Sequence, residues 1–146
     1  MMDVLIRILH EGDFTLVLKA SEENGGELRT FTGRGVSDLF RLLKREPGML
    51  AGAMLADKVT GKGAAALMIM GGIREVHTDV ISEAALELFK TSDVKVDYDE
   101  RVEKIWNRTH TDGCPVEKLC RGVTTAEACI PLIEDFVVSM HRKSIG

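Results

Sequence analysis

Residues 56–70 constrain the fold of this chain more than any other segment. Every residue from 64 to 70 is Ala, Leu, Met or Ile, and the glycines Gly71 and Gly72 follow. Paired glycines typically end a helix, because glycine adopts the left-handed conformation found just beyond its last turn. A helix that is apolar on all sides must be surrounded by protein. The segment therefore predicts a central buried helix that begins near Asp57.

The sequence on both sides alternates between strand and helix patterns. Apolar spacing and turn residues predict strands over 14–18, 28–31, 73–80 and 94–98, with a hairpin turn at 22–26. They predict helices over 2–10, 36–44 (ended by Pro47), 82–90 and 125–140, with a short helix from Pro115 and an ambiguous segment, 102–107. Strands that alternate with helices favour right-handed crossovers and helices packed on a sheet. We expect a single α/β domain over residues 1–146, arranged as a three-layer α/β/α sandwich.

Composition and charge exclude several classes of function. The net charge of −4 and the aromatic content of 5% argue against a nucleic-acid partner, which calls for a basic surplus and stacking side chains. The apolar run 64–70 is too short to cross a membrane, and charged residues interrupt the apolar residues at the N-terminus. Three cysteines cannot all pair with one another, which favours a reducing compartment. The sequence predicts a cytoplasmic protein that contacts neither a membrane nor nucleic acid.

Two lysines stand at the predicted start of the central helix. The positive end of the helix dipole disfavours cations there, so Lys58 and Lys62 indicate an anion opposite them. Their spacing of four residues places them on one helical face, and Asp57 precedes them. The sequence predicts that these three residues bind a small anionic ligand. The alternative is that both lysines extend into solvent and that Asp57 caps the helix.

The glycines between and after these lysines do not form a phosphate-binding loop of the P-loop type. That motif requires glycine where this chain has Ala56 and a serine or threonine where it has Gly63. A P-loop nucleotide hydrolase is therefore not expected.

Cys114 is the candidate nucleophile. It directly precedes Pro115, a residue suited to the first position of a helix, so the thiol lies at a helix start, where the dipole lowers a thiol pKa. Arg108 and His110 would add to that effect if the loop folds back. The alternative is a buried structural cysteine.

No metal or cofactor is expected from the remaining residues. Cys114 and Cys120 are six residues apart, wider than the spacing of structural zinc sites, and Cys129 is expected in the core. His77 is expected to be a buried histidine with Asp79 as its partner. Acidic residues around 97–103 are typical of a solvent-exposed strand end.

Several motifs together resemble a known group. They are Ala56-Asp57-Lys58-Val59 with Gly61-Lys62, the strand end 79–82, Asn107-Arg108-Thr109 and Cys114-Pro115-Val116-Glu117. The chain resembles the uncharacterised bacterial and archaeal family of small proteins that share the cytidine-deaminase-like fold. The resemblance implies a mixed sheet between helical layers and a ligand at the start of the central helix.

The zinc chemistry of deaminases is not expected to accompany this fold. Zinc deaminases carry H-x-E at one helix start and P-C-x-x-C at the next, and this chain has neither histidine nor cysteine at the expected starts. The leading hypothesis is binding of a nucleotide or phosphorylated metabolite. Its predicted site residues are Asp57, Lys58 and Lys62, with Asn107, Arg108 and Cys114 from the later loop. Two alternatives stay open: a cysteine-dependent enzyme or sulfur carrier that uses Cys114, and a non-catalytic interaction module whose apolar central helix and strand edges serve assembly, for example as a homo-oligomer.

Overall fold

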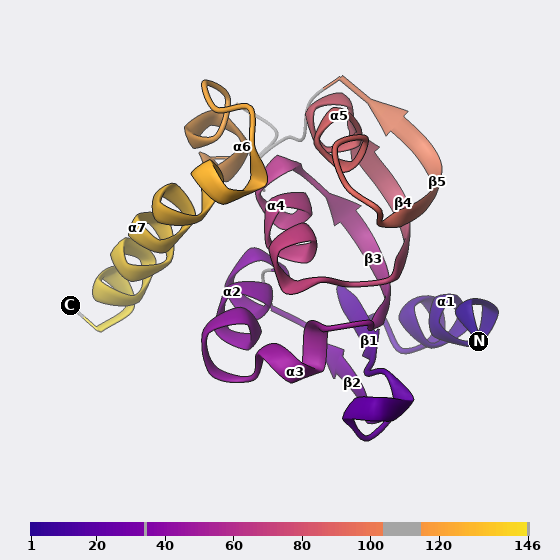
Figure 1. The fold of residues 1–146 in the computed structure, drawn as a ribbon. Coiled ribbons are helices and arrows are strands. Elements are labelled where there is room, and N and C mark those ends of the chain that lie inside the picture. Colours follow the sequence, from indigo (N-terminus) through magenta and orange to yellow (C-terminus); the bar gives the residue numbers. More distant parts are fainter. Residues whose placement is uncertain (34, 104–114, 146) are drawn as a thin grey trace.

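A mixed five-stranded sheet forms the centre of the molecule. The computed structural model describes residues 1–33, 35–103 and 115–145 (Figure 1). The strands lie in the order β2-β1-β3-β4-β5. β1 is antiparallel to both its neighbours, whereas β3, β4 and β5 are parallel. The strand bounds are β1 (Leu16–Lys19), β2 (Leu28–Phe31), β3 (Met54–Thr60), β4 (Glu75–Ser82) and β5 (Lys95–Val102).

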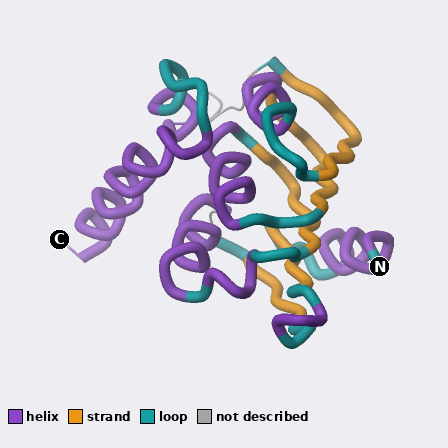
Figure 2. Tube along the Cα trace, viewed as in Figure 1, coloured by secondary structure: helices purple, strands orange, loops and turns teal. Residues whose placement is uncertain are grey.

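Helices cover the two faces of the sheet unequally. α1 lies alone on one face, over β1 and β3, and the other described helices lie on the opposite side (Figures 1 and 2). Among the described residues, no helix combines the length and apolar character needed to cross a membrane. The helix bounds are α1 (Met2–Glu11), η1 (Glu22–Asn24, a 3₁₀ turn), α2 (Gly35–Arg45), α3 (Pro47–Leu50), α4 (Lys62–Gly71), α5 (Glu83–Phe89), α6 (Pro115–Leu119) and α7 (Ala126–Ile145).

α4 is the central helix that the apolar run predicts. All residues from 62 to 68 are buried, because the sheet, α2, α5 and α7 enclose the helix. It ends at Gly72, whose φ of 77° is left-handed, and the Ile73 N–H donates to the Met68 carbonyl at 3.2 Å. The prediction of a helix surrounded by protein is confirmed.

The predicted start of this helix is wrong. Residues 54–60 form β3, and Gly61, with extended backbone (φ −95°, ψ −179°), separates that strand from α4. β3 pairs with β1 on one side and β4 on the other. It is covered on both faces, so Leu55 and Ala56 are both fully buried. A central strand of this kind loses the alternation of polar and apolar residues that distinguishes a strand from a helix.

The other predicted elements agree with the structure in type. The mixed α/β class is confirmed, and α6 and α7 cover the outer side of α4 as a further set of helices. The residues after Arg45 form the short helix α3 rather than only ending α2. Val102 ends β5, and the remainder of the ambiguous segment, from residue 104, lies outside the described residues.

Gly63 allows α6 to pack closely against α4. A Cβ at Gly63 would lie 2.3 Å from Cγ1 of Val116, and Val116 is itself buried. Gly63→Ala is therefore expected to lower the free energy of unfolding by about 1–3 kcal/mol in urea denaturation, the range for overpacking a tight contact. Gly122→Ala is the control, because a Cβ there meets nothing within 4 Å. A Gly63→Ala protein as stable as the control would contradict the close packing.

Candidate functional site

The carboxyl ends of β3 and β4 meet the start of α4 at one edge of the sheet. Ligands of open α/β sheets bind in this position. Asp57 lies in the middle of β3, three residues before its carboxyl end, with only 3% of its surface exposed, and the Thr60 hydroxyl donates to its Oδ2 at 2.8 Å. Burial raises the pKa of Asp57 to about 7, opposed by hydrogen bonds from Thr60 and from the backbone N–H groups of Lys58 and Val59. This carboxyl therefore titrates near neutral pH.

Lys62 brings a positive charge to the same edge. It is the first residue of α4 and is 8% exposed. Its Nζ donates a hydrogen bond to the Val123 carbonyl, in the connection between α6 and α7. Lys62 also lines a cavity of about 340 Å³ between α5 and that connection. The described lining residues are Lys62, Ala84, Glu87, Leu88, Arg121, Val123 and Thr124.

The charges on this cavity wall favour an anion. Lys62 and Arg121 contribute two positive charges, whereas Glu87 is the one acidic residue among the described lining residues. Glu87 also accepts a hydrogen bond from Lys90 at 2.9 Å. Asp57 and Lys58 are not among the described residues that line the cavity.

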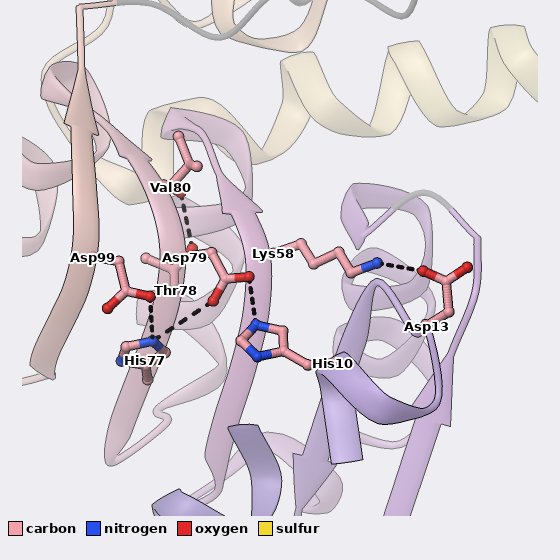
Figure 3. A network of polar contacts seen from close by, with 8 residues as sticks. All are labelled: His10, Asp13, Lys58, His77, Thr78, Asp79, Val80 and Asp99. Carbon is pink, nitrogen blue, oxygen red and sulfur yellow. Dashed lines mark hydrogen bonds and ion pairs between the residues drawn. The ribbon is translucent and has the colours of Figure 1, made fainter. Parts of the chain in front are cut away.

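Lys58 is directed to the other face of the sheet. It lies on β3, and its Nζ donates to Oδ1 of Asp13 at 2.8 Å beside the end of α1 (Figure 3). This hydrogen bond lowers the pKa of Asp13. The prediction that Lys58 and Lys62 share one helical face is wrong, because one belongs to a strand and the other to the helix that follows. Any part for Lys58 in ligand binding stays a prediction.

Three predicted site residues, Asn107, Arg108 and Cys114, lie outside the described residues. Their contribution to the site stays a prediction, as does nucleophilic chemistry at Cys114. Cys129 is fully buried on α7, as expected, and its thiol donates to the Thr125 carbonyl at 3.4 Å.

A larger hollow lies at the opposite edge of the sheet. It has a volume of about 610 Å³ and lies around η1 and the residues that precede β3 and β4. Its Lys19 donates to Oε1 of Glu22 at 3.1 Å and to the Gly26 carbonyl at 2.5 Å. Since parallel sheets bind ligands at their carboxyl edge, the smaller cavity beside Lys62 is the stronger candidate.

Sequence reasoning missed a polar cluster on the face of the sheet that carries α1. His77 is 4% exposed, as predicted for a buried histidine, but Asp97 Oδ2 is the group hydrogen-bonded to its Nδ1, at 2.7 Å. The predicted partner, Asp79, lies 3.7 Å from Nε2. A signal for this cluster was available in the sequence, because side chains two residues apart in a strand, such as those of 77 and 79, lie on the same face of the sheet. The parallel register of β4 and β5 then sets His77 beside Asp97.

Comparison with solved structures identifies the same fold in another protein. A crystal structure of a DUF1893 family protein, TM1506 from Thermotoga maritima, superposes with a TM-score of 0.80 at 25% sequence identity. The match covers 92% of this chain and 88% of the other. The model of the TM1506 family, a domain of unknown function (DUF1893), matches residues 4–137. The chain belongs to the TM1506 family.

Membership of the TM1506 family agrees with the mixed α/β fold but assigns no activity to the protein. None of the functionally curated proteins matches this chain. The function of this TM1506 family member therefore has to be argued from its own residues.

Proposed function

We propose that this protein binds a small anionic molecule in the cavity beside the first turn of α4. The observation that carries the proposal is the burial of Lys62, 8% exposed, at a helix start, on the wall of a cavity that also holds Arg121. Burial of a charge costs free energy, and the helix dipole adds to that cost for a cation. The hydrogen bond from Lys62 to the Val123 carbonyl offsets part of this cost, and an anion in the cavity would offset more of it.

The size of the cavity favours a compact ligand. About 340 Å³ is near the lower end of the range for small-molecule pockets. An ammonium and a guanidinium on one wall suit a phosphate or a carboxylate, and guanidinium groups recognise either in a two-pronged geometry. The ligand class that fits is a phosphorylated metabolite or a nucleoside monophosphate.

We also infer that the scaffold is of the cytidine-deaminase-like kind without the deaminase metal site. The residues around the starts of α4 and α5, 60–66 and 81–87, include neither histidine nor cysteine. Zinc deamination in the known manner requires a histidine and two cysteines, or three cysteines, at these helix starts. The resemblance thus supports a ligand at the same position as in the deaminases, with the positive charge of Lys62 in place of the metal ion.

Thermal unfolding with inorganic phosphate and with CMP as probes tests the proposal. At a concentration about ten times Kd, either probe should stabilise the native protein by about 1.4 kcal/mol, which raises Tm by about 3–6 °C for a chain of this size. Lys62→Met and Arg121→Gln should each abolish most of this shift. Arg121 is exposed, so its replacement is not expected to prevent folding.

Lys58→Met is the matched control, because it removes the same charge from the opposite face of the sheet. It should retain the full shift. Loss of the shift in Lys58→Met as well would favour the two-lysine site instead. An absence of any Tm shift with phosphate and with CMP in the unaltered protein would refute anion binding in this cavity.

A further inference from the structure

A cluster of ionisable side chains occupies the part of the sheet face beside α1. His77 and Asp79 come from β4, Asp99 comes from β5, and His10 extends from the last turn of α1 toward Asp79 (Figure 3). α1 packs on β1 and β3, and no other helix of the described residues lies on this side of β4 and β5. The cluster is therefore buried at His77 but accessible at Asp99, whose side chain is 65% exposed.

Three atoms of this cluster converge on one point. His77 Nε2 lies 3.7 Å from Asp79 Oδ1 and 3.6 Å from Asp99 Oδ2, and all three atoms lie within 4.8 Å of one another. These separations exceed hydrogen-bond length. Around a tetrahedral ion with ligands at about 2.0–2.2 Å, ligand atoms lie about 3.3–3.6 Å apart. The spacing fits coordination better than direct hydrogen bonding.

Two of these atoms lack a hydrogen-bond partner. Within the described part of the chain, His77 Nε2 and Asp79 Oδ1 are both buried without one. His77 is 4% exposed, so water does not readily supply the missing bond. Buried polar atoms without partners are rare and cost free energy. This second observation, independent of the acidic character of the cluster, indicates a bound group at this point.

The surrounding contacts orient the same atoms. Asp97 Oδ2 is 2.7 Å from His77 Nδ1, so the carboxylate accepts a hydrogen bond from Nδ1–H and the Nε2 lone pair of the neutral imidazole is directed into the cluster. His10 Nε2 is 2.7 Å from Asp79 Oδ2, which leaves Oδ1 as the remaining oxygen. Metal-binding histidines and carboxylates typically have such outer partners.

We propose that His77 Nε2, Asp79 Oδ1 and Asp99 Oδ2 bind one divalent transition-metal ion, with Zn²⁺ as the best fit. An imidazole nitrogen among the ligands favours zinc and its neighbours over Mg²⁺ or Ca²⁺, which prefer oxygen ligands. Three protein ligands leave a position for water or a substrate atom, as in catalytic zinc sites. The site is separate from the Lys62 cavity and does not depend on the proposed anion binding.

Calorimetric titration of tag-free, EDTA-treated and desalted protein with ZnCl₂ and MnCl₂ tests the site. One Zn²⁺ per chain is expected, together with a higher Tm in the presence of the ion. Asp99→Asn should weaken Zn²⁺ binding by at least about tenfold, since loss of even an outer partner costs that much. Folding should be retained in this variant because Asp99 is largely exposed.

Two control variants separate the site from other sources of zinc binding. Glu100→Gln removes the same charge one residue away, on the opposite face of β5, and should leave the affinity within about twofold of the original. Cys114→Ser should also retain it. Loss of binding in Cys114→Ser, equal binding by Asp99→Asn and the unaltered protein, or no stoichiometric binding of either ion would overturn the proposal. Tighter binding of Mn²⁺ than of Zn²⁺ would support the site and overturn the assignment to zinc.

Discussion

Leu67→Ala is expected to lower the free energy of unfolding by about 3–5 kcal/mol, the upper part of the range for a buried leucine. Leu67 lies in the middle of α4 and is fully buried in the main core cluster. Because helices and sheet enclose α4 over residues 62–68, the surroundings have little freedom to collapse into the space that the removed methyl groups leave. The better helix propensity of alanine offsets only a small part of this loss.

Urea denaturation followed by circular dichroism measures this change. Met70→Ala is the matched control on the same helix, because Met70 is 44% exposed, and it should cost less than about 1 kcal/mol. Similar losses for the two variants would contradict the central position of α4.

The stability of the protein is expected to fall as pH rises from 5 to 8, and Asp57 should account for about 2–3 kcal/mol of the loss. The pKa of Asp57 is about 7 in the folded protein, raised by burial from 3.8. Below pH 3.8 the carboxyl is protonated in both states. Between pH 3.8 and about pH 7 the carboxyl ionises only in the unfolded chain, so each unit of rise in pH lowers the free energy of unfolding. Above about pH 7 the carboxyl is ionised in both states and the loss of stability levels off.

Asp57→Asn tests this assignment, because an amide cannot ionise but its oxygen can still accept the hydrogen bond from Thr60. The free energy of unfolding of this variant should depend less on pH, by that same 2–3 kcal/mol between pH 5 and 8. Identical pH profiles for the variant and the unaltered protein would show that another group carries the dependence. Asp3→Asn, on the first turn of α1, is a suitable charge control.

β3 shows why sequence patterns located most elements but misassigned this one. Elements with one exposed face, such as α2 and α5, keep a periodic pattern that can be recognised. Both faces of β3 are covered, and along the sequence a single residue, Gly61, separates this strand from α4. Periodicity alone does not separate a buried strand from a buried helix, so the boundary at Gly61 could not be located from the pattern.

The position of the candidate site could be predicted from the sequence, but several of the residues that line it could not. The sequence singled out Lys62, and the structure places it at the carboxyl edge of the sheet, where the resemblance implied a ligand. Arg121 and Thr124 were missed because only the return of the chain between α6 and α7 brings them to α5. The side chains of Lys58 and Lys62 diverge because Lys58 lies on β3 and faces Asp13 beside α1, whereas Lys62 begins α4 on the other side of the sheet.

The apolar run 64–70 is sufficient to predict a helix enclosed by protein within an α/β fold, because such a segment has no other stable location in water. Which ionisable groups meet depends instead on the tertiary structure. Strand pairing sets His77 beside Asp97, and helix packing brings His10 to Asp79 and Lys62 to Val123. These contacts join residues 20 to 69 positions apart. They depend on strand register and helix docking, which local sequence patterns do not encode.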